Sequence, residues 1–244
     1  MNKEELKTVK KIQEALDTRF NDPELPLRAV THSSYAHEKT QANNHNGEGE
    51  RVEHYERLEF LGDAVLSVVV SDLVMGYFPD ATEGELSRVR AGLVNCERLA
   101  ALARDLGLGQ LIRLGRGEES TGGSDKSSIL ADVYEAVLAA VYLDRGFERT
   151  KQLIENHFVP LLQDLPPIEL LGDFKTPLQE MVQTKFKTTP RYRVVGEDGP
   201  DHEKTFTVEV IVDGKSRGAG SGRSKKEAEQ FAARKALKSG IFDE

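Results

Sequence analysis

Five acidic residues with helical spacing stand out in the N-terminal part of the sequence. Glu56, Glu59 and Asp63 follow one another at intervals of three and four residues, so on a helix they fall within about 60° of one another. Asp132 and Glu135 repeat the interval of three in a second apolar stretch. Carboxylates on one helix face repel one another, and a cation removes that repulsion. Oxygen ligands without histidine or cysteine suit Mg²⁺ or Mn²⁺ and metal-assisted hydrolysis.

Simpler interpretations of these carboxylates remain open from spacing alone. An acidic pair three residues apart is more often a solvated helix face than a metal site. Arg57 or Arg88 would also neutralise the carboxylates in structural ion pairs. Two such acidic sets, each inside a strongly apolar helix, favour the metal site without deciding for it.

A second set of polar residues belongs to the C-terminal part of the chain. Short uncharged donors on one helical stripe suit the wide, shallow minor groove of A-form RNA. Lysines at a helix start combine ammonium groups with free backbone N–H groups, which favours phosphate, although plain solvation is the usual reason for them. A histidine in a loop between two strands is placed to reach a minor groove. The stripe, the helix start and the loop contain, in that order, Thr176, Gln179 and Gln183, then Lys225 and Lys226, then His202.

The elements that must position these residues change in type along the chain. Apolar residues recur with helical spacing in the segments 6–16, 58–73, 85–106 and 129–143. Residues 1–162 are therefore predicted to form a mainly α domain. Two polar stretches, 38–51 and 115–128, are predicted to be loops, the first of them mobile.

The segment 163–172 contains paired prolines and is predicted to be a linker. Residues 173–244 then form a second domain with the order α-β-β-β-α, an α+β fold in which two helices cover one face of a three-stranded antiparallel sheet. Its expected elements are a helix at 176–185, strands at 192–196, 205–212 and 215–220, and a helix at 224–238 that opens with a capping box of Ser224 and Glu227.

Composition limits the partners and the compartment. The 244 residues carry a formal net charge of −8, but residues 172–244 contain 14 basic and 12 acidic residues, so the negative charge belongs to the remainder. Nucleic-acid binding depends on the local face and is not excluded. The single cysteine, Cys96, excludes an intrachain disulfide and a cysteine-ligated zinc site within one chain. Without an apolar run of roughly 20 residues or a secretory signal, the chain is expected to be cytoplasmic, with no membrane partner.

Several motifs together resemble the ribonuclease III family. The stretch Glu-Arg-Leu-Glu-Phe-Leu-Gly-Asp-Ala-Val-Leu at 56–66 is similar to the family signature, and Ile-Leu-Ala-Asp-Val-Tyr-Glu-Ala at 129–136 is similar to its second acidic motif. Further resemblance lies in Thr31-His-Ser-Ser-Tyr35, Glu83-Gly-Glu-Leu-Ser-Arg88 and Gly115-Arg-Gly-Glu118. The C-terminal part resembles a double-stranded RNA-binding domain in Thr-Pro-Leu-Gln-Glu, Gly-Pro-Asp-His-Glu-Lys-Thr-Phe and Ser-Lys-Lys-Glu-Ala-Glu. The order is that of the single-subunit bacterial enzyme.

The resemblance implies roles for the acidic residues. By their positions in the motifs, the four metal-binding carboxylates are Glu59, Asp63, Asp132 and Glu135. Among these, Asp63 and Glu135 match the catalytic pair. Glu56 matches an accessory acid at the substrate or dimer side of the site. Glu83 matches an accessory acid near the cleft, and its alternative role is a charge favoured by a helix N-terminus.

The resemblance also implies an activity. It indicates an endoribonuclease that uses Mg²⁺, with Mn²⁺ able to substitute, and that cuts double-stranded RNA to 5′-phosphate and 3′-hydroxyl ends with short 3′ overhangs. A homodimer through the N-terminal domain would set two sites across one duplex. Precursors of ribosomal RNA and structured messenger RNA are the expected substrates. The rivals are a non-catalytic double-stranded RNA-binding scaffold, which would lack one of the four carboxylates, and a DNA nuclease, against which the Gln/Thr stripe argues.

Overall fold

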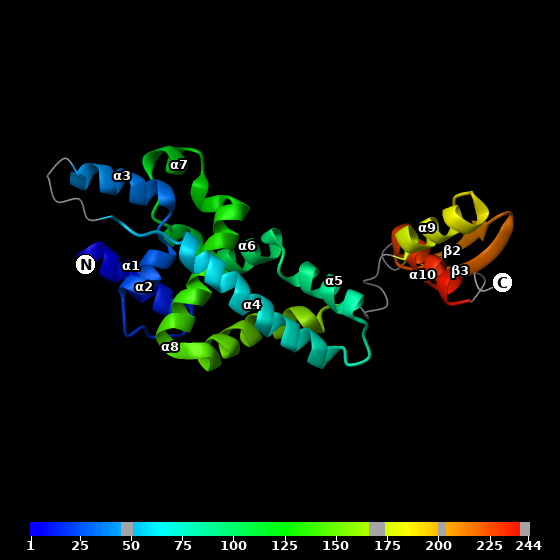
Figure 1. The fold of residues 1–244 in the computed structure, drawn as a ribbon, viewed down its shortest axis with the longest axis horizontal. Helices are drawn as coiled ribbons and strands as arrows, with labels where there is room; N and C mark the ends of the chain where they lie inside the picture. The colour runs from blue at the N-terminus through cyan, green and yellow to red at the C-terminus, as the bar shows by residue number, and fades with distance from the viewer. Residues whose placement is uncertain (45–50, 166–173, 200–203, 240–244) are drawn as a thin grey trace. The chain divides into compact units, whose positions relative to one another are not determined.

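The computed structural model divides the chain into two units, Met1–Leu165 and Pro166–Glu244 (Figure 1). The residues that the structure describes are 1–44, 51–165, 174–199 and 204–239. Most of the predicted linker at 163–172 lies outside them, so the exact domain limits stay a prediction. A mainly helical first unit and an α-β-β-β-α second unit confirm the predicted fold class.

The first unit is built around α4 (Glu56–Tyr77) and α8 (Ser127–Gln163), which pack against each other (Figure 1). Their contact is apolar because both sequences repeat buried aliphatic residues at helical spacing, as in Leu66, Val70 and Val74 of α4. The helical stretch α8 is interrupted at Gly146, whose backbone is not helical (φ 79°). The other helices of this unit are α1 (Lys3–Ala15), α2 (Glu24–Ala29), α3 (Ser33–Asn44), α5 (Glu83–Leu93), α6 (Cys96–Asp105) and α7 (Arg116–Ser120). Across the described part of the chain, no helix is both long and apolar enough to cross a membrane.

Two predictions were wrong in this unit, one of a single helix and one of a loop. The helical stretch predicted at 85–106 is two helices, because the Asn95 side chain accepts a hydrogen bond from the Arg98 N–H and starts α6. The predicted loop at 38–51 begins as helix, since α3 continues to Asn44. Tertiary hydrogen bonds hold this polar helix, such as that from the Arg116 N–H to the Glu38 carboxylate at 2.9 Å.

The predicted loop at 115–128 also contains helical structure. It holds α7, a 3-10 turn at Gly123–Asp125 and the first residues of α8. The Lys126 ammonium donates to the Glu118 carboxylate at 2.6 Å and ties the two ends of this segment together. The polar, glycine-rich composition of this segment is typical of a loop, but long-range contacts stabilise short helices within it.

The second unit contains helix α9 (Lys175–Phe186), strands β1 (Arg191–Asp198), β2 (Thr205–Val212) and β3 (Lys215–Gly222), and helix α10 (Lys225–Lys238). The strands pair antiparallel in the order β1-β2-β3. Helix α10 lies so close to β3 that a Cβ at Gly220 would stand 2.4 Å from the Ala232 nitrogen. The core between sheet and helices is formed by Leu178, Val182, Val210, Val212, Ala232, Ala233 and Ala236.

The predicted capping box at the start of α10 is only half formed. The Ser224 hydroxyl accepts a hydrogen bond from the Glu227 N–H at 3.2 Å. The Glu227 carboxylate, however, accepts from the N–H of Arg223 at 2.6 Å rather than from that of Ser224. Ser224 is therefore the N-cap as predicted, and only the reciprocal hydrogen bond of Glu227 goes to the preceding residue, Arg223.

Candidate active site

Helices α4 and α8 bring the predicted carboxylates to one place. Glu56, Glu59 and Asp63 lie in the first two turns of α4, and Asp132 and Glu135 lie near the start of α8. Glu56 and Asp63 are exposed, whereas the other three are half-buried. Their backbones are carried by rigid helices rather than loops, so the relative position of the two acidic pairs is set by how the helices cross.

A glycine fixes that crossing. A Cβ at Gly62 would stand 1.9 Å from the carbonyl oxygen of Glu135 and 2.5 Å from its carbonyl carbon. Residue 62 must therefore have no side chain for α4 to approach α8 at the level of Glu135. The residue that follows, Asp63, is thereby held beside Glu135. The available sequence signal was a glycine inside a helix, which costs about 1 kcal/mol against alanine and so needs a packing reason.

Electrostatics show that the carboxylates interact. Burial, and then the charges of Asp63, Glu59 and Asp132, raise the pKa of Glu135 to about 8. The pKa of Glu59 is raised by burial and by its acidic neighbours, and that of Asp132 is raised mainly by burial. Beyond burial, acidic neighbours therefore disfavour the charged forms of Glu135 and Glu59 across the helix contact.

This arrangement fits a hard divalent cation. The donors are all oxygen atoms, as Mg²⁺ and Mn²⁺ prefer. A cation would offset both the burial and the neighbouring charges that raise the pKa of Glu135. Within the described ranges, no three acidic, histidine or cysteine side chains already form a ready-made metal cluster. Carboxylates from two helices thus approach one another in the structure. They do not form a complete set of ligands around one point, because like charges repel one another.

The raised pKa of Glu135 predicts how stability depends on pH when divalent metal is withheld. The folded state keeps a proton on Glu135 up to about pH 8, whereas its ordinary value is 4.5. The stabilisation that Glu135 contributes is therefore fully present below its ordinary pKa of 4.5 and is lost as pH rises toward about 8. Urea unfolding across these pH values should show a falling midpoint for the wild type and a flatter profile for Glu135→Gln. Equal slopes in the two proteins would contradict the raised pKa.

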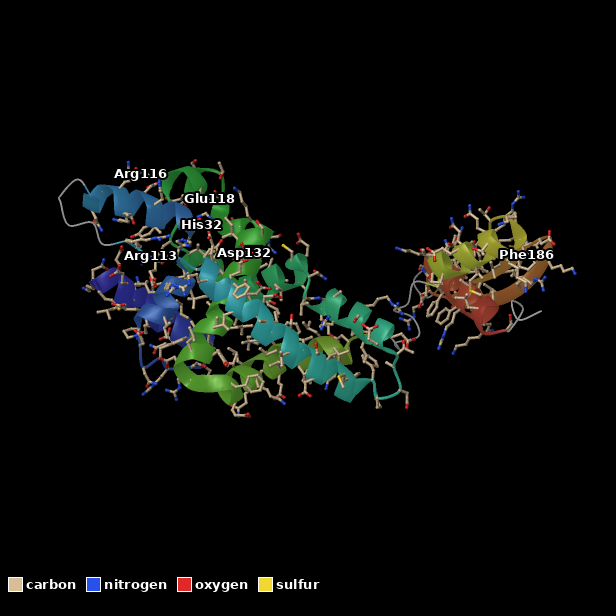
Figure 2. All side chains as sticks on the ribbon, viewed as in Figure 1. His32, Arg113, Arg116, Glu118, Asp132 and Phe186 are labelled. Carbon is tan, nitrogen blue, oxygen red and sulfur yellow. The ribbon has the colours of Figure 1, made fainter. Side chains whose placement is uncertain are left out.

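Two residues behind the acidic cluster were not predicted to have a role there. The Tyr55 hydroxyl donates to Asp132 Oδ2 at 3.3 Å, and the Tyr55 ring packs on His32 with centroids 5.6 Å apart. Burial lowers the pKa of His32, against the opposing charges of Glu118, Glu56 and Asp132. Figure 2 labels His32, Glu118 and Asp132 in this part of the first unit. Spacing gave no signal for either residue, because the contacts join segments far apart in sequence.

Glu83 lies away from these carboxylates within the described chain. It begins α5, and its carboxylate accepts a hydrogen bond from Ser87 at 2.8 Å. With Ser71, Met75 and Arg90 it lines a crevice of 230 Å³ between α4 and α5. The structure therefore places Glu83 beside the end of α4 that is opposite to Glu59. Its role near the cleft stays a prediction.

The predicted RNA-binding residues of the second unit lie on its surface. Thr176, Gln179 and Gln183 are exposed on α9, while Leu178 and Val182 of the same helix are buried. The helix therefore presents the predicted stripe away from its own core.

The remaining predicted RNA contacts lie at the start of α10 and in a strand connection. Lys225 and Lys226 are exposed in the first turn of α10, and Lys225 pairs with Glu197 at 3.6 Å. His202 lies outside the described residues. The described residues thus present both a polar helix stripe and a basic helix start.

Comparison with known proteins agrees with both units. Residues 22–162 match the family model described as ribonuclease-III-like, and residues 174–239 match the double-stranded RNA binding motif. Ribonuclease 3 of Geobacter metallireducens is 47% identical over 226 residues, which cover 93% of this chain and 89% of that protein. Ribonuclease 3 of Thermobifida fusca is 48% identical over 94% of this chain and 91% of that protein.

A solved structure resembles the first unit. The nuclease domain of ribonuclease III from Campylobacter jejuni, described with a flexible region involved in dimer formation, superposes with a TM-score of 0.53 at 38% identity. It covers 62% of this chain and 99% of that domain. Together with the family models and the full-length relatives, this likeness identifies the chain as an endoribonuclease that belongs to the ribonuclease III family.

Proposed function

We propose that this endoribonuclease cleaves double-stranded RNA with Mg²⁺, or with Mn²⁺ in its place, to leave 5′-phosphate and 3′-hydroxyl ends with short 3′ overhangs. One observation carries the proposal. The close approach of Gly62 to Glu135 sets the carboxylates of α4 beside those of α8. Burial, together with the charges of the neighbouring carboxylates, raises the pKa of Glu135 to about 8, and this supports a site that favours a cation.

The chain's own residues would divide the work as follows. Glu59, Asp63, Asp132 and Glu135 would hold the divalent ion through carboxylate oxygens. That ion, when bound, supplies Lewis-acid assistance to hydrolysis of the phosphodiester. Asp63 and Glu135, on opposite sides of the helix contact, would be the catalytic pair. Glu56, which is exposed at the start of α4, would lie on the side where the substrate or a second copy of the chain approaches.

The substrate assignment is tested by comparing nucleic acids of one sequence. We expect the purified protein to cut a long RNA duplex in Mg²⁺ and to leave the single-stranded RNA and the DNA duplex uncut, because the exposed polar stripe of α9 suits the A-form minor groove. End mapping should find 5′-phosphates and short 3′ overhangs. Equal cutting of the DNA duplex would contradict the proposal. We propose that the natural substrates are ribosomal RNA precursors and structured messenger RNA. We also propose that the protein acts in the cytoplasm, where these RNAs are found.

A homodimer through the first unit is part of the proposal. Helix α4 exposes an apolar stripe of Phe60, Val68 and Met75, of which Phe60 is 81% accessible to solvent. An exposed stripe of large apolar side chains marks a protein interface more often than a solvated surface. Phe60 also lies between the acidic residues Glu59 and Asp63, so a second chain packed on it would stand next to the site. The related nuclease domain described with a dimer-forming region supports this arrangement.

The Phe60→Glu substitution should therefore break the dimer. A charge placed in an apolar contact is desolvated without a partner, so sedimentation should shift from dimer to monomer and staggered double cutting should be lost. The matched control is Leu6→Glu, because Leu6 of α1 is 54% exposed and lies outside the residues that match the nuclease family. A dimeric Phe60→Glu protein would place the interface elsewhere.

The start of α10 should contribute to RNA affinity. Lys226→Ala removes one exposed ammonium group at a helix N-terminus, so binding of an RNA duplex should weaken at every sequence and the slope of log K against log salt should decrease by about 1. Lys238→Ala is the matched control, since Lys238 is exposed at the other end of the same helix. Gel shifts at several salt concentrations provide the measurement. An unchanged slope for Lys226→Ala would remove this residue from the RNA-binding set.

A further inference from the structure

Tyr55 stands directly before α4 and links two parts of the site. Only 3% of its surface is exposed. Its hydroxyl nevertheless ends at a carboxylate, where it donates to Asp132 Oδ2 at 3.3 Å. Buried tyrosines need a hydrogen-bond partner for their hydroxyl, and here that partner is one of the carboxylates proposed to hold the cation.

The backbone of Tyr55 is held by the segment that connects α2 and α3. Its N–H donates to the Thr31 carbonyl at 3.0 Å, and the Thr31 N–H donates to the Arg28 carbonyl at 3.0 Å. Thr31 also forms a bridge with Arg113, which extends the connection to a third segment. The carbonyl of Tyr55 accepts from the Glu59 N–H at 2.9 Å, so the phenol is anchored both to the Thr31 segment and to the start of α4.

The ring of Tyr55 is held as well. It packs against the His32 ring with an angle of 58° between the planes. His32 is itself fixed, because its ring atom Nδ1 is 2.7 Å from the Ser34 hydroxyl and its backbone N–H donates to the Arg113 carbonyl at 3.0 Å. The Ser34 hydroxyl in turn accepts from the Gly115 N–H at 2.9 Å. Because the backbone and the ring of Tyr55 are both held, the position of its hydroxyl is set. The Asp132 carboxylate must therefore orient toward this hydroxyl to keep the hydrogen bond.

Asp132 needs such a partner more than an ordinary aspartate does. It is half-buried, and the charge of Glu56 acts against its own. A neutral donor stabilises the ionised carboxylate without occupying the place of a cation. It also engages Oδ2 alone, which leaves Oδ1 for another ligand. Groups that hydrogen-bond to a metal-binding carboxylate set its orientation in this way.

We propose that Tyr55 is a positioning residue that holds Asp132 in the orientation in which its other oxygen binds the divalent cation. This inference rests on the proposed function. It adds that the affinity of the site for the cation depends on a neutral phenol outside the ligand set, anchored by the Thr31–Ser34 segment.

The test is Tyr55→Phe in the full-length chain. The substitution keeps the buried ring and removes only the hydroxyl. The matched control is Tyr134→Phe, because Tyr134 is also a buried tyrosine of this unit, 1% exposed, and its hydroxyl pairs with His157 Nδ1 at 2.9 Å rather than with a carboxylate. Binding of Mn²⁺ to the free protein, followed by electron paramagnetic resonance, reads the site without cleavage. Urea unfolding reads the general cost of losing a buried hydrogen bond.

We expect Tyr55→Phe to bind Mn²⁺ roughly tenfold more weakly than the wild type, the lower end of the range for lost outer partners of metal ligands. The Mg²⁺ concentration that gives half-maximal cleavage should rise by a similar factor, and cleavage at saturating Mg²⁺ should fall much less. Tyr134→Phe should keep wild-type Mn²⁺ affinity while losing comparable stability. Wild-type Mn²⁺ affinity in Tyr55→Phe, or equal weakening in both variants, would overturn the positioning role.

A second measurement serves if Tyr55→Phe does not fold. Mg²⁺ added to the wild type should change the ultraviolet difference spectrum of a tyrosine, with the same midpoint as binding, and Tyr134→Phe should keep this signal. A wild type that binds Mg²⁺ without any tyrosine signal would contradict the positioning role alone. A wild type that binds neither Mg²⁺ nor Mn²⁺ would overturn the proposed function and this inference together.

Discussion

Glu135→Gln should reduce cleavage of double-stranded RNA by roughly 10²–10³-fold or more, the range seen when one group that stabilises charge is removed from an active site. The amide keeps the size of the side chain but removes a ligand charge. Mn²⁺ affinity should fall with it. The fold should be at least as stable as the wild type, because the raised pKa of Glu135 shows that its ionised form is disfavoured in place.

Binding of RNA by this variant should persist, since the residues proposed to contact phosphate belong to the second unit. Gel shifts and cleavage rates measured on one preparation separate the two effects. The matched control is Glu148→Gln, an exposed carboxylate that follows the interruption of α8 at Gly146, and this variant should cleave like the wild type. Near-normal cleavage by a folded Glu135→Gln dimer would return Asp132 and Glu135 to a solvated helix face and revive the scaffold alternative.

Gly62→Ala is expected to cost both stability and activity. In a helix, alanine is normally favoured over glycine by about 1 kcal/mol. Here the added Cβ would meet the Glu135 carbonyl oxygen at 1.9 Å, so α4 and α8 must separate, and overpacking of this kind costs about 1–3 kcal/mol or more. Because a displacement of about 1 Å can cost about 10²-fold in rate, cleavage should fall about 10²-fold even where the protein folds.

The same helix contains the control for this substitution. A Cβ at Gly76 would meet nothing within 4 Å, so Gly76→Ala should be neutral or stabilising by up to about 1 kcal/mol. Urea unfolding and cleavage assays should therefore show losses of stability and rate for Gly62→Ala, and neither loss for Gly76→Ala. Loss of stability in both variants would mean that alanine destabilises helix α4 at any glycine position. The close crossing at Glu135 would then not be the cause of the loss in Gly62→Ala.

Local patterns in the sequence were enough for the acidic helices and for the second unit. Glu56, Glu59 and Asp63 are on one helix because their spacing is helical, and strand β2 runs from Thr205 to Val212 as its alternation predicts. The signature motif resembled one family closely enough to relate the two acidic helices to one site. These features depend on residues near in sequence, which is where periodicity is informative.

Other features depend on contacts between distant segments and left no local pattern. The hydroxyl of Tyr55 reaches Asp132 across 77 residues, and α7 is held by the bond from Arg116 to Glu38 across 78 residues. Phe60 is exposed although it lies within an apolar helix, because a helix pattern does not distinguish a core face from a face that a second chain covers. The capping residue Asn95 was overlooked within an apolar stretch and divided one predicted helix into two.

The most direct test of the proposed metal-dependent site is cleavage of a long RNA duplex as a function of Mg²⁺, with the wild type and Glu135→Gln side by side. Carboxylates that converge from α4 and α8, with the pKa of Glu135 raised to about 8, should need a cation to act. The wild type should cut the duplex in Mg²⁺ or Mn²⁺ and stop in EDTA, and Glu135→Gln should bind the duplex without cutting it. Undiminished cleavage by the wild type in EDTA would contradict the account.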